Sequence, residues 1–340
     1  MIKGTFFAYP PFLKNNLFDI SGKIFNEDNH LYCFYLLKKV FREKGVDLAT
    51  QDINNPAQSK FVIFLEMPKI KNILSEKNNY LLIYESPLIK PSNWVLENHK
   101  HFKKIFTWDD KLIDNKKYFK INYVHGIPKD LNFYLDKKKK LCTMIAGHKL
   151  KSHPLELYTE RIKAIRWFEK NHPEDFDLYG TGWDKYYFHG NFLGINLLRL
   201  NRLKFLTKLL KPNYSSYKGV VKSKKETYKN YKFAICYENT SSLGYITEKI
   251  FDCFLGGCVP IYLGAKNIAQ YVPRDTFVDK RNFKTYDELY QYIKNMPDTE
   301  YKKYLDALKN SAANGKLYPF SAECFAKTIC NGILEDLVKV

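Results

Sequence analysis

The sequence lacks the patterns that mark several common classes of protein. Its 340 residues include only seven cysteines, with no CxxC pair and no spacing typical of a metal site. Several of these cysteines lie within apolar runs, as buried reduced thiols do, so we expect a reducing compartment and not a disulfide-stabilised fold. No stretch approaches the ~20 consecutive apolar residues that a membrane-spanning helix needs.

The first residues also lack the pattern of a signal peptide. Residues Met1–Asn16 contain no continuous apolar core and are interrupted by Pro10 and Pro11, so we expect no signal peptide. Together with the unpaired cysteines, this predicts a cytoplasmic protein. A peripheral contact with the inner face of a membrane stays open as an alternative.

Acidic residues are scarce relative to basic ones. The chain has 36 Asp and Glu against 55 Lys and Arg, which gives a net charge of +19 at pH 7. A field of this sign attracts phosphate on nucleic acid, on anionic lipid or on a nucleotide-linked substrate. Much of the excess is scattered lysine, and no pattern of a known nucleic-acid-binding module occurs. A nucleic-acid-binding protein is therefore the less favoured alternative, and we expect no nucleic-acid partner.

Short apolar runs rich in β-formers alternate with helical patterns, which indicates parallel, doubly wound sheets. In the first half the expected strands and helix are Gly4–Ala8, Leu31–Lys44 (helix), Lys60–Leu65, Tyr80–Tyr84, Lys104–Trp108 and Ile121–Val124. After a lysine run the expected elements are Leu141–Ala146, Leu155–Lys170 (helix), Asp177–Tyr179, Lys232–Tyr237, Thr247–Leu255 (helix), Val259–Leu263, Tyr286–Asn295 (helix) and Ala322–Val340 (helix). The pattern therefore predicts an α/β protein with two Rossmann-like domains, at residues 1–138 and 141–318. The remaining residues, 319–340, are expected to form a helix that packs back on the first domain.

The segment 190–223 differs from the rest. Its centre, residues 195–211, places Leu, Arg and Lys at helical spacing. Such a basic amphipathic helix either lies on an anionic membrane surface or packs its Leu face on the domain. Packing on the domain is the more common case, and the choice between membrane and acceptor contact stays open.

The segment Tyr231–Gly264 carries the most chemistry. It is expected to form a strand, a loop of small and polar residues, a helix that begins near Thr247, and a second buried strand. Doubly wound domains hold nucleotides at such strand–loop–helix units, because a helix N-terminus offers free N–H groups to a diphosphate. Lys249 stands in the first turn, where a cation opposes the helix dipole, so a bound anion is a plausible reason for it. Glu248 suits that turn electrostatically, and its carboxylate could also bind ribose hydroxyls.

The same segment, FAICYENTSSLGYITEKIFDCFLGGCVPIYLG, resembles the signature of the α1,3/4-fucosyltransferases, glycosyltransferase family 10. The family's pattern is an aromatic–Glu–Asn–Ser/Thr group, then Tyr–x–Thr–Glu–Lys, then Val/Ile–Pro–x–x–x–Gly, and every part is present in order. The resemblance implies a GT-B fold in which two Rossmann-like domains face a central cleft and the C-terminal domain binds the donor. It also implies that GDP-fucose is contacted by Asn239, Tyr245, Glu248 and Lys249.

Two further motifs agree with this resemblance. The sequence LIYESP at residues 82–87 resembles the family's aromatic–Glu–Ser–Pro motif, so the general-base role is carried to Glu85; Phe106–Trp108 resembles a segment that follows this motif. In the second half, LYTERIKAIRWFEKN resembles the helix whose arginine binds the diphosphate. Its spacing favours Arg161, with Arg166 as the alternative.

The resemblance implies an inverting transfer of fucose from GDP-β-L-fucose to a hydroxyl of a glycan acceptor. Glu85 would accept the acceptor's proton, while Arg161, Lys249, Tyr245 and the backbone N–H groups near Gly244 stabilise the departing GDP. The acceptor oxygen is expected to be O3 of GlcNAc or Glc in a lipid-linked or cell-surface glycan. A related GT-B transferase that uses GDP-mannose or a UDP-sugar is the alternative.

No Asp-x-Asp pair follows a strand in the manner of metal-dependent transferases. The pair Asp109–Asp110 lies in the N-terminal half, away from the donor motif. We therefore expect no catalytic metal and no cofactor besides the substrate GDP-fucose.

Overall fold

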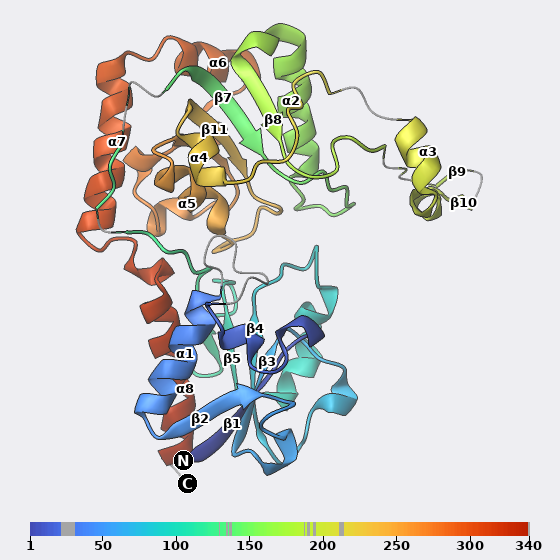
Figure 1. Cartoon of the computed structure of the whole chain (residues 1–340), viewed down its shortest axis with the longest axis vertical. Coiled ribbons are helices and arrows are strands. Elements are labelled where there is room, and N and C mark those ends of the chain that lie inside the picture. The colour runs from blue at the N-terminus through green and yellow to red at the C-terminus, as the bar shows by residue number, and fades with distance from the viewer. Residues whose placement is uncertain are drawn as a thin grey trace.

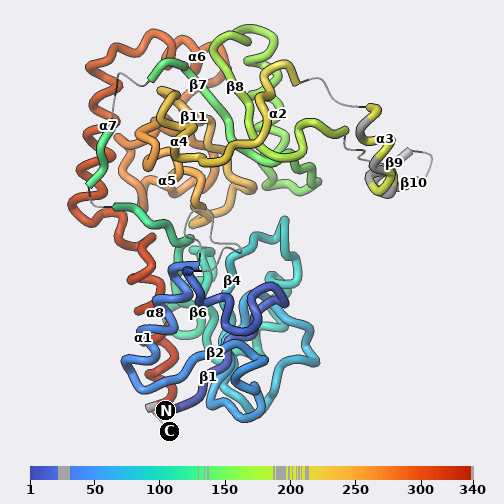
Figure 2. Tube along the Cα trace, viewed as in Figure 1, coloured from blue at the N-terminus to red at the C-terminus, as the bar shows by residue number. Residues whose placement is uncertain are grey.

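The computed structural model describes residues 1–21, 31–128, 130–133, 135, 138–186, 188, 191–192, 195–210 and 214–338. The chain forms two lobes, each built on a parallel sheet (Figure 1). The N-terminal residues and the C-terminal helix lie together at the far end of the first lobe (Figure 2). The chain therefore passes from the first lobe to the second and returns.

The sheet of the first lobe has six parallel strands in the order β2-β1-β3-β4-β5-β6. These strands are β1 (Ile2–Phe7), β2 (Val46–Thr50), β3 (Phe61–Leu65), β4 (Asn78–Ile83), β5 (Lys104–Thr107) and β6 (Tyr118–Lys120). The order reverses between β1 and β3, and the carboxyl ends of parallel strands at such a reversal are where doubly wound sheets bind ligands.

The strand expected at Ile121–Val124 is wrong, because the edge strand β6 ends one residue earlier. The amide of Ile121 still donates to Thr107 O (3.0 Å). The next residues turn toward the second lobe, where Asn122 Nδ2 donates to Pro319 O (3.1 Å) and His125 N donates to Phe320 O (2.9 Å). These bonds lie where the chain crosses between the lobes for the first time, beside the point where it returns.

Two helices, α1 (Tyr32–Glu43) and α8 (Ala322–Val338), pack side by side on this sheet (Figure 1). Apolar residues of α1 recur at helical spacing and are buried against the sheet and α8. The far end of α8 is also held by polar contacts, since Lys104 Nζ lies 3.3 Å from Asp336 Oδ1 and Tyr80 OH donates to Asp336 Oδ2 (3.0 Å). The C-terminal helix is thus part of the core of the first lobe.

The sheet of the second lobe has five parallel strands in the order β13-β12-β11-β7-β8. They are β7 (Lys140–Ile145), β8 (Phe176–Tyr179), β11 (Tyr231–Tyr237), β12 (Val259–Leu263) and β13 (Val278–Asp279). The helices of this lobe are α2 (Tyr158–Asn171), α4 (Lys224–Tyr228), α5 (Glu248–Leu255), α6 (Tyr286–Lys294) and α7 (Asp298–Ala313). The central strands are almost wholly apolar and buried, as parallel strands covered on both faces are.

Residues 191–192 and 195–210 project from the second lobe (Figure 2). They contain a short antiparallel pair, β9 (Asn191–Phe192) and β10 (Ile195–Asn196), then a 3₁₀ helix (Leu197–Arg202) and the helix α3 (Lys204–Leu209). The expectation of one amphipathic helix over 195–211 is therefore wrong for the described residues, because β10 takes the first two and the rest divides into a 3₁₀ helix and α3. Residue 211 lies outside the described residues.

Four apolar side chains among the described residues of this projection are largely exposed. Large apolar side chains are 48% to 74% exposed at Leu203, Phe205, Leu209 and Leu210. The expected packing of the Leu face on the domain is thus not seen for these residues, and contact with a membrane stays a prediction. In the part of the chain that the structure describes, no helix is long and apolar enough to cross a bilayer.

Candidate active site

A cavity of about 330 Å³ lies at the carboxyl ends of β7, β8 and β11, where the strand order of the second sheet reverses. Its walls are the loops after these strands, the start of α5 and the segment Val220–Lys224. Five cations line it, against the two carboxylates of Glu248 and Asp252: Lys149, Arg161, Lys222, Lys224 and Lys249. The cavity is thus suited to an anionic ligand of the size of a nucleotide.

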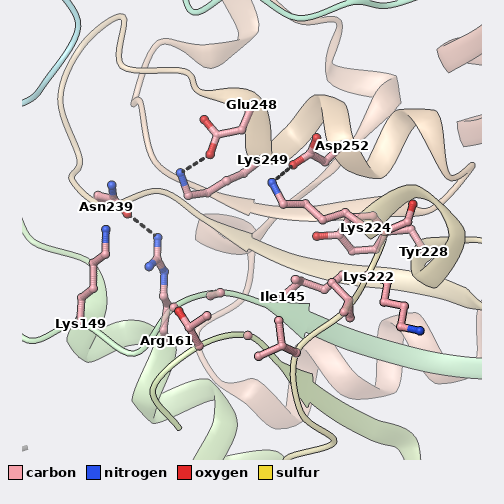
Figure 3. Close-up of a pocket in the computed structure, with 17 residues that line it drawn as sticks. Ile145, Lys149, Arg161, Lys222, Lys224, Tyr228, Asn239, Glu248, Lys249 and Asp252 are labelled. Carbon is pink, nitrogen blue, oxygen red and sulfur yellow. Dashed lines mark hydrogen bonds and ion pairs between the residues drawn. The ribbon is translucent and has the colours of Figure 1, made fainter. Parts of the chain in front are cut away.

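Arg161 enters this cavity from the first turns of α2, and its side chain is held rigidly. It is 4% exposed, Nε and Nη2 donate to Tyr237 O (3.1 and 2.6 Å), and Nη2 also donates to Asn239 Oδ1 (2.9 Å). Burial lowers the pKa of Arg161, although the nearby Glu238 opposes this. Figure 3 shows Arg161 and Asn239 joined by this bond beside Lys149.

The alternative arginine lies elsewhere. Arg166 Nη1 pairs with Glu169 Oε2 (2.6 Å), and its guanidinium lies over the ring of Tyr214, 3.9 Å from the centroid. Its side chain is 45% exposed and does not line the cavity. Of the two candidate diphosphate ligands, the structure brings only Arg161 together with Asn239 and Lys249.

Lys249 stands in the first turn of α5, as expected, and a buried carboxylate explains how it is tolerated there. Its Nζ lies 3.1 Å from Glu238 Oε2, 2.7 Å from Thr247 Oγ1 and 3.4 Å from Glu248 Oε1. Burial alone would lower the pKa of Lys249, but the carboxylates of Glu238 and Glu248 outweigh burial and raise it. Lys249 therefore stays protonated and faces the cavity as a fixed positive charge.

Glu238 was not among the predicted site residues. It directly follows β11 and is wholly buried; its carboxylate accepts from Thr247 N (2.8 Å), from Thr247 Oγ1 (2.7 Å) and from Lys249 Nζ. It therefore binds the N-terminus of α5 and orients Lys249 at the same time. Its position between an aromatic residue and Asn239 was visible in the sequence, but its burial was not.

Glu248 and Lys224 form the other wall of the cavity (Figure 3). Burial alone would raise the pKa of Glu248, but Lys249 and Lys224 outweigh burial and lower it to about 2. Lys224 Nζ also donates to Asp252 Oδ2 (2.9 Å). Sequence reasoning missed Lys224 and Lys149, since neither lies in a recognised motif and only the fold brings them to the cavity.

Tyr245 links the two lobes. Its ring lies against Trp108 and Tyr123 of the first lobe, with centroid separations of 4.8 and 5.6 Å. Trp108 Nε1 donates to Tyr84 O (2.7 Å), and Tyr123 OH donates to the same oxygen. Tyr245 thus contacts two rings that are hydrogen-bonded to the main chain directly before Glu85.

Gly244 lies in the same contact between the lobes. Its φ of +78° and the closeness of Trp108 O and Lys120 Nζ leave no room for a side chain. Its N–H donates to Asn267 Oδ1 (3.0 Å), and Asn267 Nδ2 donates to Asp110 Oδ2 (2.6 Å). The predicted role of this N–H at the diphosphate would need the bond to Asn267 to break.

Glu85 follows β4 at the carboxyl end of the first sheet, and it lines a second cavity of about 440 Å³. Burial raises the pKa of Glu85; among the charges that act on it are Lys149, Glu248 and Lys249 of the other lobe. The remaining walls are mostly apolar and aromatic and include Tyr9, Phe12, Phe34, Leu65, Ile89 and Tyr123. One carboxylate thus lines a mostly apolar cavity and is acted on by charged residues of the basic one, and a carboxylate in this setting can accept a proton from a group bound beside it.

We next consider whether clusters of side chains in the described residues could bind a metal ion. In the described ranges, no group of three or more His, Cys, Asp or Glu side chains could hold a metal ion. Asp110, one of the pair noted in the sequence, instead pairs with Lys120 (2.7 Å) and accepts from Tyr271 OH (2.6 Å).

Two Rossmann-like lobes that present their strand ends to each other form the GT-B fold of glycosyltransferases. The solved structure of an alpha1,3-fucosyltransferase with GDP-fucose is similar, with a TM-score of 0.53 and 18% identity over 89% of this chain and 81% of that one. Residues 208–333 match the family described as glycosyltransferase family 10 (fucosyltransferase) C-term. This match confirms the resemblance for residues 208–333.

Curated relatives agree over shorter segments. The alpha-(1,3)-fucosyltransferase FucT of Helicobacter pylori is 38% identical over 112 residues, which are 32% of this chain and 23% of that protein. The 4-galactosyl-N-acetylglucosaminide 3-alpha-L-fucosyltransferase 9 of Mus musculus is 33% identical over 99 residues, 28% of each chain. The matched segments thus span less than a third of the length of these relatives.

Proposed function

We propose that the protein is an inverting fucosyltransferase that moves fucose from GDP-β-L-fucose to a glycan hydroxyl, with Glu85 as the general base. The family match of residues 208–333 supports a donor site in the second lobe. The similarity to a solved alpha1,3-fucosyltransferase with GDP-fucose supports the same arrangement of the two lobes.

One observation carries the proposal. Lys149, Glu248 and Lys249, which line the basic cavity of the second lobe, are among the charges that act on the Glu85 carboxyl group of the first lobe. Tyr245 bridges the same gap through Trp108 and Tyr123. A base and a cationic leaving-group site on opposite sides of a cleft are what a single displacement at a sugar carbon requires.

In the proposed reaction, the acceptor oxygen attacks the anomeric carbon of fucose while the bond from that carbon to the β-phosphate oxygen breaks. Glu85 takes the proton of the attacking hydroxyl, and GDP leaves with the electron pair, which inverts the anomeric centre. Arg161 and Lys249 stabilise the charge that develops on the β-phosphate. Asn239 holds Arg161 in place, Glu248 binds the ribose hydroxyls, and Tyr245 closes the site.

The acceptor is proposed to bind in the cavity of about 440 Å³ beside Glu85. Its aromatic and aliphatic walls suit the apolar face of a sugar ring, and Glu85 supplies a carboxylate to it. The name of the murine relative specifies a 4-galactosyl-N-acetylglucosaminide as its acceptor. We therefore propose O3 of GlcNAc, or of Glc, as the hydroxyl that this chain fucosylates.

The test is a calorimetric titration of the purified protein, in EDTA, with GDP, GDP-fucose, GDP-mannose and UDP. Lys249→Met removes the cation while keeping an unbranched side chain, and Lys303→Met, at an exposed position of α7, is the matched control. We expect GDP and GDP-fucose to bind more tightly than UDP, and binding to weaken in Lys249→Met alone. Tighter binding of UDP, or equal binding by the two variants, would refute the donor assignment.

The role of Glu85 is tested separately. General-base catalysis contributes roughly 10²- to 10⁴-fold, so Glu85→Gln should lower kcat by about that factor and leave the Kd for GDP unchanged. An equal loss of GDP affinity would instead place Glu85 in the donor site.

A further inference from the structure

Glu66 lies beside the proposed base in an unusual backbone conformation. It directly follows β3, is 5% exposed, and has a φ of +64°. A residue with a side chain adopts this left-handed conformation at a cost of about 1 kcal/mol or more. Both the strain and the burial of a carboxylate oppose folding, so the surrounding contacts must hold Glu66 in place.

Those contacts are directed at the main chain around Glu85. One carboxylate oxygen of Glu66, Oε1, accepts from the backbone N–H groups of Tyr84 and Glu85 (3.0 Å each). The other oxygen, Oε2, accepts from Asn93 Nδ2. Glu66 therefore has donors on both oxygens, and its carboxylate is engaged although it lines the same cavity as Glu85.

Asn93 completes the arrangement from the other side. It is wholly buried; its Oδ1 accepts from Met67 N (2.8 Å), and its Nδ2 also lies 3.3 Å from Glu85 O. Trp94 Nε1 donates to the same carbonyl oxygen (3.2 Å). The N–H and the C=O of Glu85 are thus both bound by side chains packed around this segment, which fixes the position from which the Glu85 side chain leaves the main chain.

We propose that Glu66, together with Asn93, is a positioning residue that fixes the main chain of Glu85 and so aims the Glu85 carboxylate at the acceptor hydroxyl. The proposal rests on the proposed function, because it assigns Glu66 a task in the same reaction. Of the two carboxylates in the cavity, Glu66 binds the main chain and Glu85 meets the substrate.

The test exploits the chemical difference between an acid and an amide. In Glu66→Gln, the new amide can present its oxygen to the two N–H groups, but its NH₂ then faces the NH₂ of Asn93. If Asn93 turns over, its NH₂ faces the N–H of Met67 instead. Either arrangement leaves a buried donor without an acceptor.

The double variant Glu66→Gln/Asn93→Asp exchanges the two groups. The introduced amide can donate to one oxygen of the introduced carboxylate, and the other oxygen of that carboxylate still accepts from Met67 N. The carbonyl oxygen of Glu85 still accepts a hydrogen bond from the indole N–H of Trp94. The single variant Asn93→Asp instead places two carboxylates against each other. Glu97→Gln, at a side chain that is 80% exposed, makes the same chemical change away from the site.

The measurements are kcat and KM for transfer from GDP-fucose to 4-galactosyl-N-acetylglucosaminide, the Kd for GDP, and hydrogen exchange of the peptide that contains Glu85. A misplacement of about 1 Å costs on the order of 10²-fold in rate. We expect Glu66→Gln to lower kcat by roughly 10- to 100-fold, with the Kd for GDP within about twofold of the parent. The Glu85 amide should exchange faster, and the double variant should recover most of the kcat and of the protection. Glu97→Gln should match the parent.

Three results would overturn the proposal: a normal kcat in Glu66→Gln, no recovery in the double variant, or a loss of GDP binding in proportion to kcat. If the parent protein transferred no fucose, the proposed function would fail. Hydrogen exchange would then still decide whether Glu66 and Asn93 hold the main chain of Glu85, because unchanged exchange in Glu66→Gln refutes that independently.

Discussion

Glu66 should make the stability of the first lobe fall as the pH rises. Burial raises the pKa of its carboxyl group from 4.5 to about 7, against the hydrogen bonds from Asn93, Glu85 and Tyr84, which lower it. The folded chain therefore binds more protons than the unfolded chain between these two pH values. Because stability changes with pH by the difference in bound protons, the free energy of unfolding must decrease across this window. An ordinary salt-bridged carboxylate acts in the opposite direction.

The magnitude follows from the two pKa values. Their difference of about 2.5 corresponds to roughly 3 kcal/mol over the whole window, at about 1.4 kcal/mol for each factor of ten. Most of it, about 2 to 3 kcal/mol, falls between pH 5 and pH 8. Removing the titrating group by Glu66→Gln should remove this part of the pH dependence.

The assay is urea unfolding of the whole chain at pH 5 and pH 8, followed by tryptophan fluorescence, to which Trp94 and Trp108 of the first lobe contribute. The free energy of unfolding of the parent should fall between the two pH values by about 2 to 3 kcal/mol more than that of Glu66→Gln. Glu97→Gln should behave like the parent. The same fall in parent and Glu66→Gln would refute the reasoning, as would a parent that gains stability relative to the variant.

Three other predictions concern the second lobe and its projection. Arg161→Lys keeps the charge but loses the planar fork that binds Asn239 and a phosphate together, so the Kd for GDP should rise roughly 10- to 100-fold, whereas Arg166→Lys should leave it unchanged; equal effects would mean that Arg161 does not meet the ligand. Gly244→Ala should lower the melting temperature and kcat together, because its Cβ would collide with Trp108 O; a normal melting temperature would show that this contact between the lobes is loose in solution. Phe205→Asp should reduce sedimentation with vesicles that contain phosphatidylserine, since Phe205 is 74% exposed; unchanged sedimentation would end the membrane hypothesis for residues 195–211.

Much of the second lobe was predictable because its signals are local. A buried strand, a polar loop and a helix that begins at Thr247 follow one another within a single segment, and the structure places β11 and α5 within one residue of the expected bounds. The pattern also marked Glu248 and Lys249 as residues of one helical turn. Their relation to Arg161 depends on how α2 packs, which no local pattern records.

The misses have a shared cause, which is contact between residues far apart in the chain. Strand β2 (Val46–Thr50) was not predicted, because its five residues are too short a run to show a clear alternation, and pairing with β1 decides its conformation. Glu66 could have been noticed as a lone acid after five apolar residues. Only its hydrogen bonds with Tyr84 and Asn93, however, indicate what its carboxylate does. Lys224 reaches the cavity through the fold alone.

The two lobes share one structural feature, which is a buried glutamate that accepts hydrogen bonds from a neighbouring segment. In each, a buried glutamate stands directly after a central strand: Glu66 after β3 and Glu238 after β11. Each carboxylate accepts from a backbone N–H of a segment that also presents a residue to the cleft, Glu85 in the first lobe and Lys249 in the second. A buried carboxylate costs several kcal/mol in desolvation unless it is fully hydrogen-bonded, and both glutamates meet that condition, with donors from the main chain and from side chains. In the proposed reaction, both would fix a charge of the site before substrate arrives, and such fixed geometry makes an electrostatic site effective without reorganisation during the reaction.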